Sequence, residues 1–126
     1  MSDVDLYMMK LSPEALYRMT AIHRLARNVF RDAAERLYFG QPAFSAHGKV
    51  ILFYGAYKDH VSICVGDGWV DFLKNQYPQF HYTRFTVTFP YDEPFPEDAV
   101  QVICELLRQN HGKRENTGAG GTGDVP

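Results

Sequence analysis

The chain has 126 residues, 45% hydrophobic and 14% aromatic, and its 13 Lys and Arg residues against 15 Asp and Glu give a formal net charge of −2. This apolar content excludes a disordered chain, and the length fits a single domain with one buried core. The small negative charge gives no overall attraction to a phosphate backbone, so nucleic acid is not an expected partner.

The N-terminal segment has the composition of a protein that is not exported. Asp3 and Asp5 stand where a signal peptide needs positive charge, and no later run approaches the roughly 20 apolar residues of a membrane helix. We therefore expect a cytoplasmic protein without a membrane segment. Cys64 and Cys104 have the spacing of neither a redox pair nor a zinc site, which predicts two reduced, buried thiols.

The first predicted element is a long amphipathic helix. Ser12 followed by Pro13 is typical of a helix start, because the serine caps the first turn and proline tolerates the first helical position. Apolar residues then recur at a spacing that gathers them on one helical face. They are Ala15, Met19, Ile22, Ala26, Val29, Phe30, Ala33 and Leu37. Gly40 and Pro42 end this pattern and predict a turn.

A β-hairpin is predicted next. The ranges 50–57 and 60–65 alternate as strands do, and Lys58-Asp59 would join them. In this register one face is apolar, pairing Ala56 with Val61, Tyr54 with Ile63 and Leu52 with Val65. The opposite, mixed face pairs Tyr57 with His60, Gly55 with Ser62 and Phe53 with Cys64. We expect the mixed face to meet solvent or a ligand.

The remaining sequence predicts a short helix, a strand and a second long helix. Gly66-Asp67-Gly68 ends the hairpin, and the short helix carries Trp69, Val70, Phe72 and Leu73 before Pro78. Alternation from Tyr82 to Phe89 predicts one strand. The last helix begins at Pro96, has the inner stripe Val100, Ile103, Cys104 and Leu107, and ends before Gly112.

These elements predict an α+β fold in which an antiparallel sheet packs against N- and C-terminal helices. The range 112–126 is rich in glycine and almost free of apolar residues. It therefore predicts a flexible tail after a single domain that covers residues 1–111.

Several short motifs occur in an order that resembles the YdhG-like domain family. They are Tyr38-Phe39-Gly40-Gln41-Pro42-Ala43-Phe44, then Gly48-Lys49, then Phe53-Tyr54-Gly55-Ala56-Tyr57-Lys58-Asp59-His60-Val61, and finally Thr88-Phe89-Pro90 with Pro94 and Pro96. The resemblance runs from the first helix to about Arg108. It implies a compact α+β domain in a frataxin-like arrangement. Members are widely labelled frataxin-like intracellular iron chaperones, so the resemblance also implies iron binding.

Exposed carboxylates are the candidates for an iron site, because hard cations prefer oxygen ligands. The first long helix offers Glu14, Asp32 and Glu35, but among arginines that repel a dication. The better group lies around a proline-rich turn and consists of Asp92, Glu93, Glu97 and Asp98. Its alternative role is structural, as a solvated loop with favourable charges at a helix N-terminus.

A second hypothesis places a small-anion or metabolite site, or a surface for a partner protein, on the mixed face of the sheet. Its candidate residues combine aromatic walls with a guanidinium that attracts anions. They are Tyr38, Gln41, Phe44, Tyr57, His60 and Arg84. The alternative is that the aromatic residues pack the core and Arg84 is solvated.

Two expectations about activity and assembly complete the sequence-based predictions. The sequence contains no nucleophile, base or phosphate-loop pattern, so we expect a binding protein rather than an enzyme. If part of the apolar hairpin face stays uncovered, it could also support a homodimer.

Overall fold

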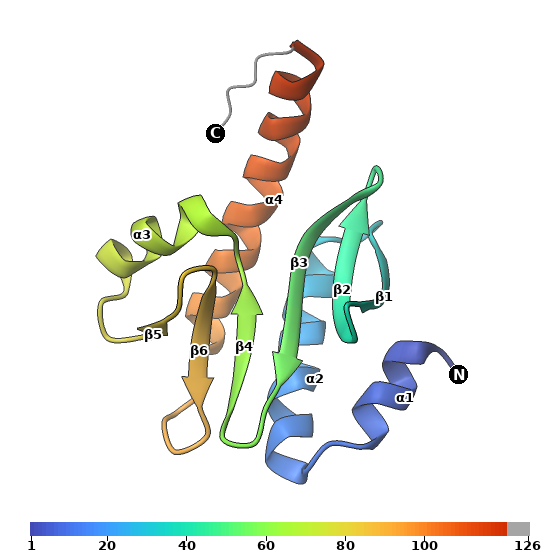
Figure 1. Ribbon diagram of the computed structural model, residues 1–126, viewed down its shortest axis with the longest axis vertical. Helices are drawn as coiled ribbons and strands as arrows, with labels where there is room; N and C mark the ends of the chain where they lie inside the picture. The colour runs from blue at the N-terminus through green and yellow to red at the C-terminus, as the bar shows by residue number, and fades with distance from the viewer. Residues whose placement is uncertain (121–126) are drawn as a thin grey trace.

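The computed structural model describes residues 1–120 and shows a six-stranded antiparallel sheet with four helices (Figure 1). The strand order is β1-β2-β3-β4-β6-β5. The elements are α1 (Asp3–Met9), α2 (Pro13–Val29), β1 (Ala34–Tyr38), β2 (Gln41–Ala46), β3 (Lys49–Ala56), β4 (His60–Cys64), α3 (Asp67–Gln76), β5 (His81–Tyr82), β6 (Thr86–Pro90) and α4 (Glu97–Gly120). The predicted α+β class is confirmed.

The helices gather on one side of the sheet. In Figure 1 strands β3 and β4 lie in front of α2 and α4, and all four helices pack residues against a single hydrophobic cluster on that side. We call this side the core face. Its fully buried members include Met19 and Ile22 of α2, Tyr54 of β3 and Ile103 of α4. The other side, which no described helix covers, is called the outer face.

Helix α2 begins as predicted and ends earlier than predicted. Ser12 caps it by accepting a hydrogen bond from the Ala15 N–H at 3.3 Å. The helix stops at Val29 rather than near residue 37. Arg27 closes this end, because its guanidinium donates to three carbonyl oxygens of the segment that follows the helix. These oxygens belong to Phe30, Arg31 and Ala33.

The residues predicted to extend that helix form the hairpin β1–β2 instead. Tyr38 pairs with Gln41 across a tight turn, in which Phe39 and Gly40 have φ angles of 53° and 79°. Two successive positive φ values match the twist of antiparallel strands, so this turn favours a hairpin. Pro42, which was predicted to lie in a turn, lies within β2 opposite Leu37. The sequence also did not predict α1, which a capping box between Ser2 and Asp5 starts.

The central hairpin β3–β4 is confirmed. Ala56 pairs with Val61 and Gly55 with Ser62, as the alternation predicted. The next predicted strand, residues 82–89, is wrong as a single element. It is divided into β5 and β6, which pair with each other around a turn at Thr83 and Thr86. A strand that folds back keeps its alternation, so periodicity alone does not reveal the turn.

Helix α4 starts next to Pro96, as predicted, and passes Gly112, where the sequence predicted it to end. One glycine inside a helix costs only about 1 kcal/mol relative to alanine, so it does not enforce a stop. The predicted tail begins within this helix, and its residues 121–126 lie outside the described range. Within residues 1–120, no helix combines the length and apolar character that crossing a membrane requires.

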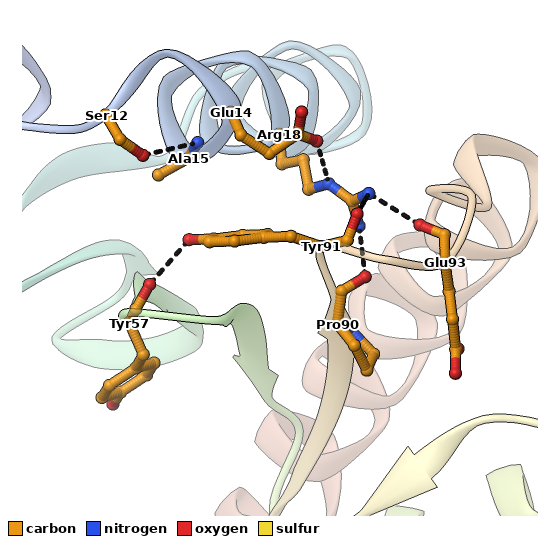
Figure 2. A network of polar contacts seen from close by, with 8 residues as sticks. All are labelled: Ser12, Glu14, Ala15, Arg18, Tyr57, Pro90, Tyr91 and Glu93. Atoms are coloured by element: carbon orange, nitrogen blue, oxygen red, sulfur yellow. Dashed lines mark hydrogen bonds and ion pairs between the residues drawn. The ribbon is translucent and has the colours of Figure 1, made fainter.

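One buried charge joins α2 to the connection between β6 and α4 (Figure 2). Arg18 is only 4% exposed, and its Nε donates to the Glu14 carboxylate at 2.7 Å. Its two terminal nitrogens donate to the carbonyl oxygens of Pro90, Tyr91 and Glu93 at 3.0, 3.1 and 2.7 Å. Because the charge is paired and surrounded by acceptors, Arg18 stabilises the fold and does not offer a binding group.

Candidate ligand-binding face

The outer face carries no acidic side chain from any strand. Glu35 is the one Asp or Glu residue within the six strands, and it pairs with Phe44, whose side chain is fully buried on the core face. The basic strand residues are Arg36, Lys49, His60 and His81. Side chains alternate between the two faces of a strand, so Arg36, the neighbour of Glu35, points to the outer face. The strands therefore add no negative charge to the outer face, although Asp59 and Glu93 from neighbouring turns contact His60 and His81 there.

Glu35 belongs to a polar cluster on the core side. Its carboxylate accepts a hydrogen bond from the Tyr54 hydroxyl at 2.6 Å and contacts His23 Nδ1 at 2.9 Å. Burial, followed by the hydrogen bond to Glu35, raises the pKa of Tyr54 well above its usual range. The side chain of His23 is 41% exposed, so His23 lies at the edge of the core. The cluster holds β1, β3 and α2 together.

An aromatic patch occupies one end of the outer face. The ring of Tyr38 lies 4.6 Å from that of Phe39 and 6.1 Å from that of Phe53, between centroids. Phe39 is 85% exposed and holds a positive φ, a conformation that bulky residues rarely adopt. Strain of this kind often accompanies a functional surface. Exposed His47 in the β2–β3 turn also has a positive φ, of 55°, but histidine adopts this conformation more readily than phenylalanine.

Gln41 connects the patch to the end of the β3–β4 hairpin. Its Nε2 donates to the Tyr57 hydroxyl at 2.6 Å, and the Tyr57 ring stacks on His60 at 4.8 Å between centroids. His60 Nδ1 is 2.8 Å from the carboxylate of Asp59. The hydrogen bond with His60 lowers the pKa of the Asp59 carboxyl group. Three of the predicted binding residues therefore meet on the outer face.

Two of the predicted binding residues lie elsewhere. Phe44 is completely buried in the core, so it does not line the outer face. Arg84 lies in the β5–β6 turn, where its guanidinium is 5.0 Å from the Phe85 ring centroid. In that turn the Phe85 carbonyl oxygen accepts a hydrogen bond from the N–H of Val65, which follows the last residue of β4. His60 is the first residue of β4. Arg84 and the Tyr57–His60 pair therefore lie at opposite ends of the strand, and Tyr38 borders the three residues that do meet.

An open groove of about 1320 Å³ adjoins the outer face at the end of α2 and the β2–β3 turn. Its lining includes three arginines, Arg31, Arg36 and Arg108, and two acidic residues, Asp32 and Glu105. Three positive charges against two negative ones leave an excess of one cation. Arg36 belongs to both surfaces; its role could not be predicted because the spacing of Ala33 and Leu37 indicates a helix where β1 forms.

The four candidate metal ligands do not form a cluster. Glu97 pairs with Arg24 at 2.9 Å, and Glu93 contacts His81 Nε2 at 2.9 Å. In the part of the chain that the structure describes, no three His, Cys, Asp or Glu side chains come close enough to hold a metal ion. Iron binding by Asp92, Glu93, Glu97 and Asp98 stays a prediction.

Both cysteines are free thiols in the fold. Cys104 is fully buried, and burial raises its pKa to about 12. Cys64 is partly buried on the outer face, and burial raises its pKa as well. A raised pKa keeps a thiol protonated at neutral pH and unreactive as a nucleophile.

These observations define the class of protein. It is an α+β domain that has all its described helices on one face of the sheet and an aromatic patch on the other. No protein-family model matches the chain, and no curated protein matches it in sequence. Among solved structures, a crystal structure of a protein from the DUF1801 family, YdhG of Bacillus subtilis, is similar with a TM-score of 0.78 and 15% identity, over 87% of this chain and 91% of that chain. The chain therefore has a YdhG-like fold; at this identity the likeness concerns the fold alone.

Proposed function

We propose that the protein is a non-catalytic binding module that recognises a small organic anion through the outer face, next to Arg36. The observation that carries this proposal is the absence of strand carboxylates on the outer face of a chain whose net charge is −2. Complementary charge of this kind selects ligands and raises their local concentration.

The groove beside the outer face supports the choice of an anion. Arg31 and Arg108 lie in its lining together with Arg36, so an anion there meets several guanidinium groups. Guanidinium groups bind carboxylates and phosphates through paired hydrogen bonds. The neighbouring Tyr38 and Phe53 rings give an organic ligand an apolar surface to cover.

The thiol chemistry supports a binding role rather than catalysis. Cys64 and Cys104 are the strongest nucleophiles that the chain offers, and burial raises the pKa of both. An enzyme that uses a cysteine needs the opposite shift. Iron binding, which the family resemblance implied, would instead need oxygen ligands gathered in one place.

The test is a thermal-shift comparison of citrate, inorganic phosphate, adenosine monophosphate and anaerobic ferrous iron. A ligand that prefers the folded form raises the melting temperature by mass action. We expect at least one anion to stabilise the protein and Arg36→Gln to remove most of that shift. Arg24→Gln is the matched control, because it removes the same charge from an exposed arginine that pairs with Glu97.

The proposal is overturned if the Arg24 and Arg36 variants behave alike, or if no anion gives a shift. Stabilisation by ferrous iron that disappears when Asp92 and Glu93 are changed to Asn and Gln would favour the iron carrier instead.

A further inference from the structure

The centre of the outer face contains a position without a side chain between two aromatic rings. Gly55 lies on β3, with Phe53 and Tyr57 two residues away on either side along the same face. Its φ does not lie in the left-handed region, so backbone conformation does not require glycine here. What glycine provides is space above the sheet.

The amide group of Gln41 occupies that space. A Cβ added to Gly55 would lie 3.0 Å from the Gln41 Oε1 and closer still to the rest of the amide. The amide is held there by one exposed hydrogen bond, from Nε2 to the Tyr57 hydroxyl. A flexible side chain with a single exposed contact can move away without losing a buried partner.

Beside Gly55 lies a buried hydroxyl that makes no hydrogen bond to any described side chain or backbone group. Ser62 is the direct partner of Gly55 in β4 and is 6% exposed. Its strand neighbours Val61 and Ile63 are completely buried in the core, so the Ser62 side chain points to the outer face. Buried polar groups in proteins are nearly always paired, and an exception requires an explanation.

We infer that the space over Gly55 and Ser62, here called the Gly55 slot, is a binding site for a planar aromatic ring that carries a carboxamide or carboxylate group. The Gln41 amide is the displaceable cover of this slot. This inference rests on the proposed binding role of the outer face and specifies the ligand class. Phe53 and Tyr57 would flank the ring, and its planar polar group would replace the Gln41 amide within reach of the Ser62 hydroxyl.

The exchange of one planar group for another is favourable in three respects. The Gln41 amide moves into water, where its hydrogen bonds are satisfied. The Ser62 hydroxyl gains a partner that the free protein does not provide. The ligand ring buries apolar surface between two aromatic side chains, which the amide of glutamine cannot do.

The test uses benzamide and benzoate as a matched pair of probes, one neutral and one anionic, titrated into the full chain labelled with nitrogen-15. We expect the amide signals of Gly55 and Ser62 and the side-chain NH₂ signals of Gln41 to shift together as the slot fills. The signals of Val61 and Ile63, which face the core, give the reference for indirect effects.

Three variants separate a binding slot from ordinary packing. Gln41→Ala removes the cover and should strengthen benzamide binding about five-fold, which corresponds to losing one exposed hydrogen bond. Gly55→Ala fills the slot with a methyl group and should weaken binding at least about ten-fold, whereas Ser62→Ala removes the polar partner and should weaken it about five-fold. Thr86→Ala, on the same face of β6 but paired with Cys64 rather than with Ser62, is the control and should leave binding unchanged.

The outcomes distinguish this inference from the proposed function. If benzoate shifts signals around Arg36 while Gly55 and Ser62 stay unchanged with both probes, anion binding stands and the slot is wrong. If benzamide shifts Gly55 and Ser62 and the anions tested above do not bind, the slot stands without the anion proposal. Weaker binding by Gln41→Ala would show that Gln41 is a ligand contact and would overturn its role as a cover.

Discussion

The two faces of the sheet treat polar groups in opposite ways. On the core side, the guanidinium nitrogens of Arg18 all have acceptors. The Glu35 carboxylate accepts a hydrogen bond from the Tyr54 hydroxyl and contacts His23 Nδ1. On the outer side, the buried Ser62 hydroxyl has no partner among the described residues and the strained Phe39 is exposed. The polar groups on the core side thus satisfy one another, whereas the outer side holds a hydroxyl without a described partner and an exposed phenylalanine in a strained turn.

The largest effect is expected from Arg18→Ala. The substitution removes a donor from three carbonyl oxygens, of which only that of Pro90 keeps another described donor, the Glu93 N–H, so we expect a loss of about 3 kcal/mol in the free energy of unfolding. Urea denaturation followed by circular dichroism measures it. Arg24→Ala, which breaks an exposed ion pair, should cost less than about 1 kcal/mol. Equal losses for the two variants would contradict the distinction between buried and exposed charge.

Tyr54→Phe should destabilise the protein by about 2 kcal/mol, because the Glu35 carboxylate then loses a donor while it stays buried. Tyr57→Phe removes the hydroxyl of an exposed tyrosine on the outer face and should change stability by less than about 0.5 kcal/mol. Thermal unfolding of both variants gives the comparison. A larger loss for the Tyr57 variant would reverse the roles of the two faces.

Cys104 should make the stability depend on alkaline pH. Burial raises its pKa from 9.0 to about 12, so the unfolded chain releases this proton at lower pH than the folded protein does. The free energy of unfolding must then fall as the pH rises through this range, by about 1 kcal/mol near pH 10. Chemical denaturation between about pH 8 and pH 10 should show a smaller decline in Cys104→Ala than in the wild type. The same decline in both proteins would exclude this thiol as the cause.

The smallest effect has the opposite sign. Phe39→Asn should raise the free energy of unfolding by about 0.5 kcal/mol, because asparagine tolerates the positive φ that phenylalanine holds under strain. If Phe39 serves recognition, the same variant should weaken any ligand of the outer face. Stability measured by denaturation and binding measured by the NMR titration would then change in opposite directions. A destabilised variant would show that the ring supports the fold.

The sequence predicted the centre of the sheet well because two independent signals agreed there. In β3 and β4 the alternation of apolar residues and the register of the hairpin indicate the same pairs, including Tyr57 next to His60. At the end of α2 the spacing of the apolar residues fits both a helix and a strand, so it does not distinguish the two. Ala33 and Leu37 satisfy helical spacing, and they also satisfy the alternation of a strand, so the helix was extended through β1.

That single error explains most of what was missed at the site. Without β1 and β2 as strands, neither the position of Arg36 on the outer face nor that of Gln41 over Gly55 could be derived. Phe44 was placed on the wrong side for the same reason. The solitary hydroxyl of Ser62 could not be predicted at all, because the lack of a hydrogen-bond partner depends on the positions of all surrounding side chains.

The Arg18 contacts have a consequence for biosynthesis. Its three carbonyl partners come 72, 73 and 75 residues later in the chain, so they leave the ribosome long after α2 has been made. Until then the guanidinium has only Glu14, on the same helix, as a described side-chain partner, so burying it early would leave its terminal nitrogens without acceptors. Completion of the fold is therefore tied to the arrival of the segment after β6, and a nascent chain that stalls before residue 93 should remain open to proteases.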